Sequence, residues 1–280
     1  MNNHLIAARD AFAARHREER VELNGRDWGV IDTGGSGAAF VFLPGTLGRA
    51  DIFWQQIEAM PERRVLALSY PADGGIAQWL DDIVALLDQR GIGQAAVLGS
   101  SLGGYAAQAL ALAAPERVEH LFAANTLAST AGIAERPPYA LDLQRAPIGD
   151  LRAGFAGAMA AWGQTHPEQA DLVDLLLAEV AGRIPEGELR MRLQALKTAE
   201  PLGGSSYPAG RVTVIETDDD PLIPPELRAG VRARWDGAQV FRFAWGGHFP
   251  YVLRPNLYAG LIRARLGLQA LPDDWQDGVA

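Results

Sequence analysis

The feature that most constrains this chain is a break from an apolar strand to an apolar helix with a serine at the break. Residues 94–98 are short and largely apolar, as in a buried strand, and residues 105–114 are rich in alanine and leucine, as in a helix. Between them Ser101 has Gly99 two positions before it and Gly103 two positions after it. Glycine lets the strand and helix backbones pass close together. The segment therefore predicts a sharp turn that projects the Ser101 hydroxyl above the edge of a sheet.

Two other interpretations of this segment are weaker. Ser100 does not fit the spacing, because Leu98 stands two positions before it and Gly103 three positions after it. An ordinary loop is also possible for a short string of glycine and serine, since both residues are common. The strand before the string and the helix after it favour the turn with Ser101 at its apex.

The composition of the chain limits the class of protein. Its 280 residues, 48% hydrophobic and 21% charged, are typical of a globular chain with a large core. The net charge of -9 argues against a nucleic acid or an anionic membrane as partner. The absence of cysteine excludes disulfides, thiolate metal sites and a cysteine nucleophile. No signal peptide and no apolar run of 18 residues is present, so we expect a cytoplasmic protein without a membrane span.

The order of the predicted elements indicates an α/β fold. An N-terminal helix is expected over residues 4–19, followed by a hairpin that turns at Asn24-Gly25. The predicted strands are 20–23, 28–33, 38–43, 65–68, 94–98, 118–124, 211–216 and 240–243, with helices over 76–89, 105–114 and 255–266. This alternation predicts a mostly parallel, doubly wound sheet of about eight strands with helices on both faces.

The rhythm of the sequence changes after Asn125. Between about 130 and 205 we expect helices over 150–162, 167–180 and 185–196 and no strand. We interpret this stretch as a helical cap inserted into a single domain of residues 1–280. The alternative is a run of helices packed directly on the core. Residues from Pro272 onward are expected to form a frayed tail.

An aspartate and a histidine follow the last two predicted strands. A serine hydroxyl is a weak nucleophile that needs a base to take its proton and an acid to orient the base. After a turn of this kind the acid and then the histidine follow in the chain, at the carboxyl ends of strands. Asp220 precedes a proline, which favours an extended backbone, and we prefer it to Asp218 and Asp219. The alternative for Asp220 is a solvated acidic turn that caps the next helix.

His248 is the predicted base. It follows the last strand and comes directly after Gly246 and Gly247, whose backbone freedom helps the imidazole to reach a serine across the sheet edge. A partly buried structural histidine is the alternative. The other histidines lie where solvated or structural roles are expected, at His4, His16, His120 and His166.

Acyl transfer also requires two backbone N–H groups aimed at the developing oxyanion. Leu102 is expected to supply one, because it follows the serine at the positive end of a helix. The loop over residues 44–48 is expected to supply the other, with Thr46 as first choice and Leu47 as second. A plain strand-to-helix turn describes this loop equally well. No zinc spacing, dinucleotide motif or phosphate-binding lysine loop is present, so we expect no metal and no organic cofactor.

Taken together, these motifs resemble the α/β-hydrolase fold superfamily. The resemblance covers about residues 20–268 and is carried by residues 43–48, 99–104, 220–221 and 246–250. Within the superfamily the chain is most similar to the maspardin-like branch, through residues 42–44, 52–56, 67–71 and 246–251. One departure is Pro44-Gly45, where the superfamily commonly has His-Gly. Another concerns the branch itself, because some maspardin-like members have lost part of the triad and look like binding proteins.

The residues and the resemblance together predict a serine hydrolase. The expected activity is that of a carboxylesterase on a small, partly apolar ester, through an acyl-enzyme on Ser101. A carbon–carbon bond hydrolase or a thioesterase with the same residues is the enzymatic alternative. A non-catalytic binding protein on the same fold is the alternative from another class. The presence of Ser101, Asp220 and His248 favours an enzyme.

Overall fold

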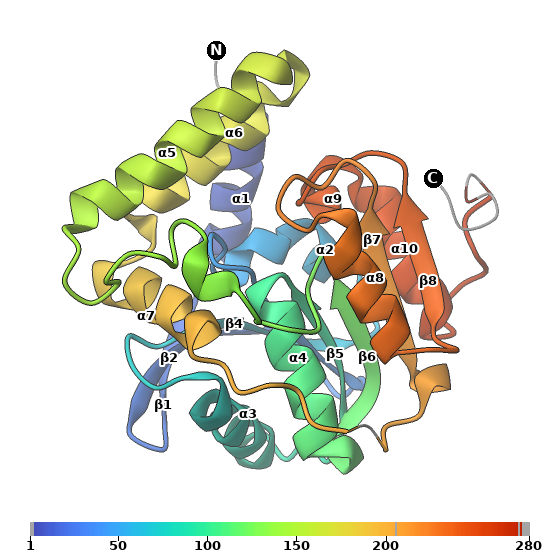
Figure 1. Cartoon of the computed structure of the whole chain (residues 1–280). Helices are drawn as coiled ribbons and strands as arrows, with labels where there is room; N and C mark the ends of the chain where they lie inside the picture. The colour runs from blue at the N-terminus through green and yellow to red at the C-terminus, as the bar shows by residue number, and fades with distance from the viewer. Residues whose placement is uncertain (1–2, 205, 274, 276–280) are drawn as a thin grey trace.

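A single eight-stranded sheet organises the computed structural model, which describes residues 3–204, 206–273 and 275. The strand order is β1-β2-β4-β3-β5-β6-β7-β8 (Figure 1). The strands are β1 (Glu19–Leu23), β2 (Arg26–Asp32), β3 (Ala39–Leu43), β4 (Arg64–Ser69), β5 (Ala95–Ser100), β6 (Val118–Ala124), β7 (Val212–Thr217) and β8 (Gln239–Phe243). Pairing is antiparallel from β1 to β2 and from β2 to β4, and parallel from β4 to β8. The prediction of a mostly parallel α/β sheet of about eight strands is confirmed.

Helices cover both faces of the sheet because its central strands are apolar on both sides. In β3, Phe40 and Phe42 belong to one core and Val41 and Leu43 to the other. One face is covered by α2 (Trp54–Glu58) and α10 (Pro255–Arg265), and the other by α3 (Ile76–Gln89), α4 (Leu102–Ala113) and α8 (Pro225–Arg234). Because these strands are buried on both faces, their sequences are continuous apolar runs rather than alternating apolar and polar residues.

The long connection between β6 and β7 is helical where the sequence predicts helices. It contains α5 (Ile148–Thr165), α6 (Ala170–Ala178) and α7 (Glu186–Lys197), and its described residues include no strand. The N-terminal helix α1 (His4–Arg15) lies beside α6 (Figure 1). Short helical turns complete the chain at Ala50–Phe53, Pro115–Arg117, Ile133–Glu135, Pro167–Gln169, Glu179–Arg183, Ala209–Arg211 and Pro250–Leu253.

Most elements begin or end a few residues from their predicted bounds, and three of the helices show this most clearly. The first helix ends at Arg15 rather than at residue 19, where the chain turns into β1. The helix predicted over 167–180 is divided, because it starts with a 3-10 turn and ends in a π-helical turn over Glu179–Arg183. The helix predicted from residue 105 begins at Leu102, directly after the Ser101 turn. The predicted tail from Pro272 lies largely outside the described residues.

The crossing of β5 and α4 explains the glycines around Ser101. A Cβ added at Gly99 would lie 1.9 Å from the carbonyl oxygen of Gly103, and one added at Gly103 would lie 2.0 Å from the carbonyl oxygen of Leu43. Both distances are far below van der Waals contact, and the obstacle in each case is backbone. The helix can follow the strand this closely only without side chains at these positions.

We predict that Gly103→Ala lowers the free energy of unfolding by about 1–3 kcal/mol or more, because the added methyl group forces the α4 and β3 backbones apart. Urea denaturation followed by circular dichroism measures the change. Gly157→Ala is the matched control: Gly157 is exposed on α5 with no atom in the way, and alanine there is expected to stabilise the helix by up to about 1 kcal/mol. A Gly103→Ala protein as stable as the wild type would contradict this prediction.

Candidate active site

Ser101 lies at the apex of the turn between β5 and α4 with a strained backbone. Its φ of 55° and ψ of -119° are unfavourable for any residue except glycine. The turn is fixed by the segment that follows the neighbouring strand β6. The N–H of Ser101 donates to the Ala124 carbonyl at 3.0 Å, and its carbonyl accepts from Thr126 Oγ1 at 2.7 Å. Ser101 is partly exposed, whereas Ser100 is buried within β5.

Asp220 and His248 form a buried hydrogen-bonded pair beyond the ends of β7 and β8. Each of the two residues is 6% exposed, and Nδ1 of His248 lies 3.0 and 2.9 Å from the two carboxylate oxygens of Asp220. Asp220 Oδ1 also accepts from the N–H groups of Leu222 at 2.9 Å and Ile223 at 3.1 Å. An ionised carboxylate only accepts hydrogen bonds, so Nδ1 carries the proton and Nε2 of the neutral imidazole is the basic nitrogen.

The pKa of Asp220 shows that the pair favours the ionised acid. Burial alone would raise this pKa. The charge that His248 carries when protonated and its hydrogen bond, with the hydrogen bonds from Asn125 and Leu222, outweigh burial and hold the pKa of Asp220 below its usual value. Asp220 is therefore a carboxylate at neutral pH and can orient the imidazole of His248.

The three consecutive aspartates have three different environments. Asp219 accepts from the N–H groups of Gly246 at 3.2 Å and Gly247 at 2.8 Å, and so holds the loop that carries His248. Asp218 forms an ion pair with Arg242. Asp220 is the one of the three that contacts the histidine, as the sequence analysis prefers.

The sequence analysis missed Asn125, which follows β6 at the same edge of the sheet. Its φ of 41° lies in the left-handed region, which asparagine tolerates better than most residues. The buried side chain donates from Nδ2 to Asp220 Oδ2 at 2.9 Å and to Thr217 Oγ1 at 3.0 Å. The neighbours of Asn125, Ala124 and Thr126, are the residues that bond Ser101. A polar residue directly after an apolar parallel strand is the signal that could have indicated it.

Residues 124–126 contact both the Ser101 turn and Asp220, and so connect the serine to the Asp220–His248 pair at one edge of the sheet. Within the residues that the structure describes, Ser101 Oγ makes no hydrogen bond to His248. Catalytic hydrogen bonds often tighten only when substrate is bound. Proton transfer from Ser101 to His248 stays a prediction.

The predicted oxyanion loop after β3 lies against Ser101. A Cβ added at Gly45 would be 3.2 Å from Ser101 Cβ and 3.9 Å from its Oγ. The N–H of Gly48 donates to the Gly45 carbonyl at 3.1 Å, which closes a turn with Thr46 and Leu47 at its corners. In the described part of the chain, the N–H groups of Thr46 and Leu102 donate to no protein acceptor. Both predicted oxyanion donors are therefore free to bind another group.

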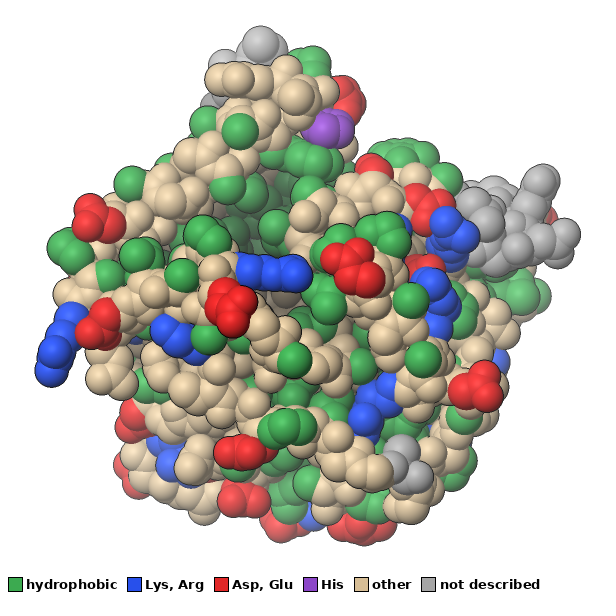
Figure 2. All heavy atoms as spheres, in the orientation of Figure 1, with side chains coloured by type: hydrophobic (Ala, Val, Ile, Leu, Met, Phe, Trp, Pro, Cys, Tyr) green, Lys and Arg blue, Asp and Glu red, His purple; other side chains and the backbone are tan. Residues whose placement is uncertain are grey.

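His248 lines an apolar pocket of about 330 Å³ beneath α5 and α6. The side chains that surround it are mostly hydrophobic, and include Met159, Trp162, Leu172, Val173, Leu176, Leu222 and Phe249. Figure 2 shows hydrophobic side chains in the hollow beside α5. A second depression, of about 490 Å³, lies between residues 128–129 and α8 and has none of the predicted site residues in its wall. The pocket at His248 is therefore the candidate substrate site.

Two classes of site are not found in the described residues. They contain no group of three or more His, Cys, Asp or Glu side chains that could hold a metal ion. They also contain no helix long and apolar enough to cross a membrane.

We predict that Asn125→Gly keeps the backbone conformation but loosens Asp220, which slows the reaction of Ser101 with a fluorophosphonate by about 10-fold. Asn24→Gly is the matched control, because Asn24 also has a positive φ, of 49°, and also donates from Nδ2 to an aspartate, Asp82, at 2.9 Å. Each variant loses a hydrogen bond to a charged acceptor, so each should cost about 1–3 kcal/mol of stability. Equal labelling rates in the two variants would show that Asn125 has no role in the site.

Comparison with known proteins places this geometry in a family. The model of the alpha/beta hydrolase family matches residues 40–261. Maspardin of Homo sapiens is 28% identical over 243 residues, which cover 82% of this chain and 77% of maspardin. A putative carbamate hydrolase, RutD of Klebsiella pneumoniae, is 28% identical over 240 residues, covering 76% of this chain and 85% of RutD.

A solved structure supports the same fold. The enol-lactonase of Burkholderia xenovorans LB400 has a TM-score of 0.74 and 17% identity, and the match covers 89% of this chain and 100% of the lactonase. The family model spans most of the chain, including β3 to β8 and the segments that carry Ser101, Asp220 and His248. The chain belongs to the α/β-hydrolase family.

Proposed function

We propose that this chain is a serine carboxylesterase in which Ser101 attacks the ester carbonyl and His248 takes its proton. The observation that carries the proposal is the buried Asp220–His248 pair at the same sheet edge as the strained Ser101 turn. An ionised, multiply hydrogen-bonded aspartate at Nδ1 fixes the imidazole in the tautomer that leaves Nε2 free to accept a proton, as a general base requires. The intact set of residues favours an enzyme over a binding protein.

The proposed reaction has two steps. Attack by Ser101 Oγ forms a tetrahedral intermediate whose oxyanion accepts hydrogen bonds from the N–H groups of Thr46 and Leu102. His248 then gives its proton to the departing alcohol, which leaves an acyl group on Ser101. In the second step His248 takes a proton from water as the water oxygen attacks the acyl carbonyl. His248 then returns this proton to Ser101 Oγ as the bond to the serine breaks and the carboxylic acid is released. Asp220 keeps the imidazole in the tautomer that accepts at Nε2.

The pocket supports a small substrate with an apolar acyl group. Its volume is at the low end of the range for small-molecule sites, and its wall is mostly hydrophobic. A relative described as a putative carbamate hydrolase and a structural neighbour described as an enol-lactonase both fit attack on a carboxylic acid derivative. A thioester, a carbon–carbon bond flanked by carbonyl groups, and a ligand that is bound but not cleaved are the other outcomes that the assays must separate.

We predict that Ser101→Ala lowers kcat for p-nitrophenyl butyrate by at least about 10³-fold, because the nucleophile is lost while the pocket is kept. Ser100→Ala is the matched control and should keep kcat within about 3-fold, since Ser100 is buried within β5 and has no part in the proposed reaction.

A fluorophosphonate probe tests the same proposal without knowledge of the substrate. Mass spectrometry of the labelled protein should find the adduct on Ser101. Labelling of Ser100, or a wild type that neither reacts with the probe nor cleaves short and medium esters, would refute the proposed function.

We also predict that Ala158→Phe narrows the acyl pocket, because Ala158 lines it from α5. The ratio of kcat/KM for a hexanoate ester over an acetate ester should fall about 10-fold. Ala160→Phe places the same ring on the same helix outside the pocket lining and should leave the ratio within about 2-fold. An unchanged ratio in Ala158→Phe would mean that this pocket does not hold the acyl chain.

A further inference from the structure

The carbonyl groups of the loop after β3 are held by the protein at four places. Pro44 O accepts from the Tyr70 hydroxyl at 2.9 Å, and Gly45 O accepts from the Gly48 N–H at 3.1 Å. Thr46 O and Gly48 O accept from the same nitrogen, Nη1 of Arg192, at 3.1 and 2.6 Å. In a trans peptide the carbonyl and the following N–H point in opposite directions. The Gly45 carbonyl, held by the Gly48 N–H, therefore fixes the direction of the Thr46 N–H, and the Thr46 carbonyl, held by Arg192, fixes that of the Leu47 N–H.

Arg192 reaches this loop from the helical connection between β6 and β7. It lies on α7, 0% exposed, with Nη2 donating to Glu188 Oε2 at 3.2 Å and its guanidinium 5.5 Å from the centre of the Tyr70 ring. Tyr70 in turn holds Pro44. Arg192 and Tyr70 therefore form one unit that contacts three of the four held carbonyls.

Stability alone gives little reason for a charge at this position. Burial of a guanidinium is costly, and apolar residues of similar volume are often at least as stabilising as a buried ion pair. The cost is visible in the structure, because Nε of Arg192 is buried without a hydrogen-bond partner among the described residues. An apolar side chain would fill the same space but could not direct the carbonyls of Thr46 and Gly48.

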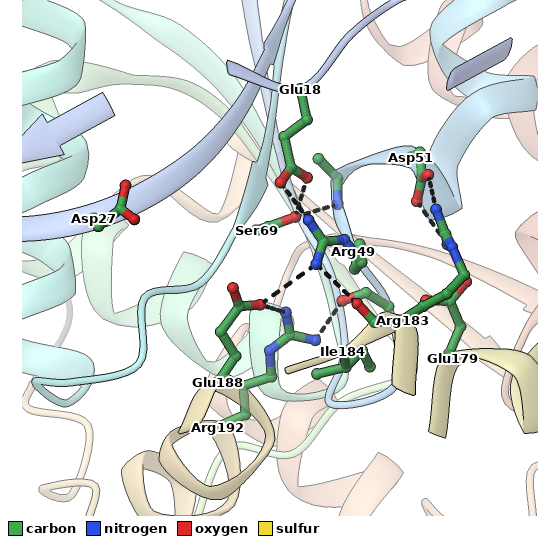
Figure 3. Close-up of polar contacts among 12 residues, drawn as sticks. Glu18, Asp27, Arg49, Asp51, Ser69, Glu179, Arg183, Ile184, Glu188 and Arg192 are labelled. Carbon is green, nitrogen blue, oxygen red and sulfur yellow. Dashed lines mark hydrogen bonds and ion pairs between the residues drawn. The ribbon is translucent and has the colours of Figure 1, made fainter. Parts of the chain in front are cut away.

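A network of ion pairs keeps the guanidinium of Arg192 in place (Figure 3). Glu188 also lies 3.9 Å from Arg49, which donates to the Arg183 carbonyl at 2.9 Å and pairs with Glu18. Arg183 pairs with Asp51 at 2.6 Å. The network thus joins α7, the segment before β1 and the residues that directly follow the loop. Its members turn toward one another in the close-up, so the loop and the helical connection are held as one unit.

We propose that Arg192 is a positioning residue for the oxyanion site. By holding the Gly48 carbonyl it fixes the residue whose N–H holds the Gly45 carbonyl, and so directs the Thr46 N–H toward the oxyanion formed on Ser101. By holding the Thr46 carbonyl it also fixes the N–H of Leu47, the second candidate donor. The inference rests on the proposed function, because an oxyanion arises only if Ser101 attacks a carbonyl. It adds that α7 takes part in the reaction through the backbone of residues 44–48, without touching the substrate. Because the loop's N–H groups bind charge that exists only after attack, Arg192 acts on kcat and leaves substrate binding unchanged.

Arg192→Met keeps the aliphatic stem and removes the donors. With p-nitrophenyl butyrate we expect kcat to fall about 10- to 100-fold with KM within about 3-fold, as for a small displacement of a catalytic group. A trifluoromethyl ketone, which forms an oxyanion on the serine, should bind more weakly by a similar factor. Arg192→Lys keeps a charged donor and should recover part of the lost kcat, which a purely structural role does not predict.

Arg183→Met is the matched control, because it breaks the same network without touching the carbonyls of residues 44–48. It should lower the melting temperature and keep kcat and ketone affinity within about 3-fold of the wild type. If Arg192→Met does not fold, Tyr70→Phe decides the question, since it removes the single donor to Pro44 and keeps the ring; kcat should fall several-fold with KM unchanged.

The possible failures can be told apart. A folded Arg192→Met protein with the kcat and ketone affinity of the wild type overturns the role of Arg192 and leaves the esterase proposal standing. A loss of kcat of the same size in Arg183→Met also overturns the role of Arg192. Where Arg192→Met does not fold, a Tyr70→Phe protein with unchanged kcat overturns it. A wild type without turnover and without labelling at Ser101 overturns both proposals.

Discussion

A close contact between backbones, where the start of α4 lies against the end of β3, is the constraint on which the rest of the site depends. A Cβ at Gly103 would lie 2.0 Å from the Leu43 carbonyl, so the two segments meet with no side chain between them. The chain can leave β5 and enter this contact only through a strained residue, which is Ser101. The same contact brings the loop after β3 next to the serine. The proposed nucleophile, a helix N-terminus and a turn with free N–H groups therefore lie together for steric reasons.

The parallel sheet then sets which groups meet this turn. The segments after β6, β7 and β8 leave the same edge of the sheet, and hydrogen bonds between these segments hold the side chains of the site in place. Asp219 holds the glycines before His248, Asn125 holds Asp220, and Asp220 holds His248. Burial raises the pKa of a carboxyl at this place, and the contacts around Asp220 outweigh that effect and lower the pKa. The position and tautomer of His248, and so its proposed role as base, depend on three loops together rather than on one residue.

Sequence reasoning succeeded where a feature is local and failed where it is not. The fold class and the Ser101 turn could be predicted, because strand, glycine spacing and helix all lie within residues 94–114. In the sequence, only the proline after Asp220 favoured it over Asp218 and Asp219. In the structure, contacts with the loop that carries His248 distinguish Asp220 from Asp219. Asn125 and Arg192 could not be assigned, because their partners are 95 and 144 positions away, at Asp220 and Gly48. The periodicity of apolar residues predicts which face of a helix or strand is buried, but it does not predict hydrogen bonds between residues so far apart in the chain.

The buried charges between α7 and the loop after β3 also have a physical reason that apolar packing could not supply. Hydrophobic contact is non-directional, whereas a guanidinium donates in a fixed plane and therefore fixes the orientation of the carbonyls that it binds. Such a group is tolerated only when its partners are all present, because each buried charge left unpaired is strongly destabilising. Arg192 needs Glu188, and Glu188 lies beside Arg49, which needs Glu18 and the Arg183 carbonyl. The helical connection that lines the pocket and the backbone that would bind the oxyanion are therefore coupled, because disrupting either one leaves charged groups without their partners.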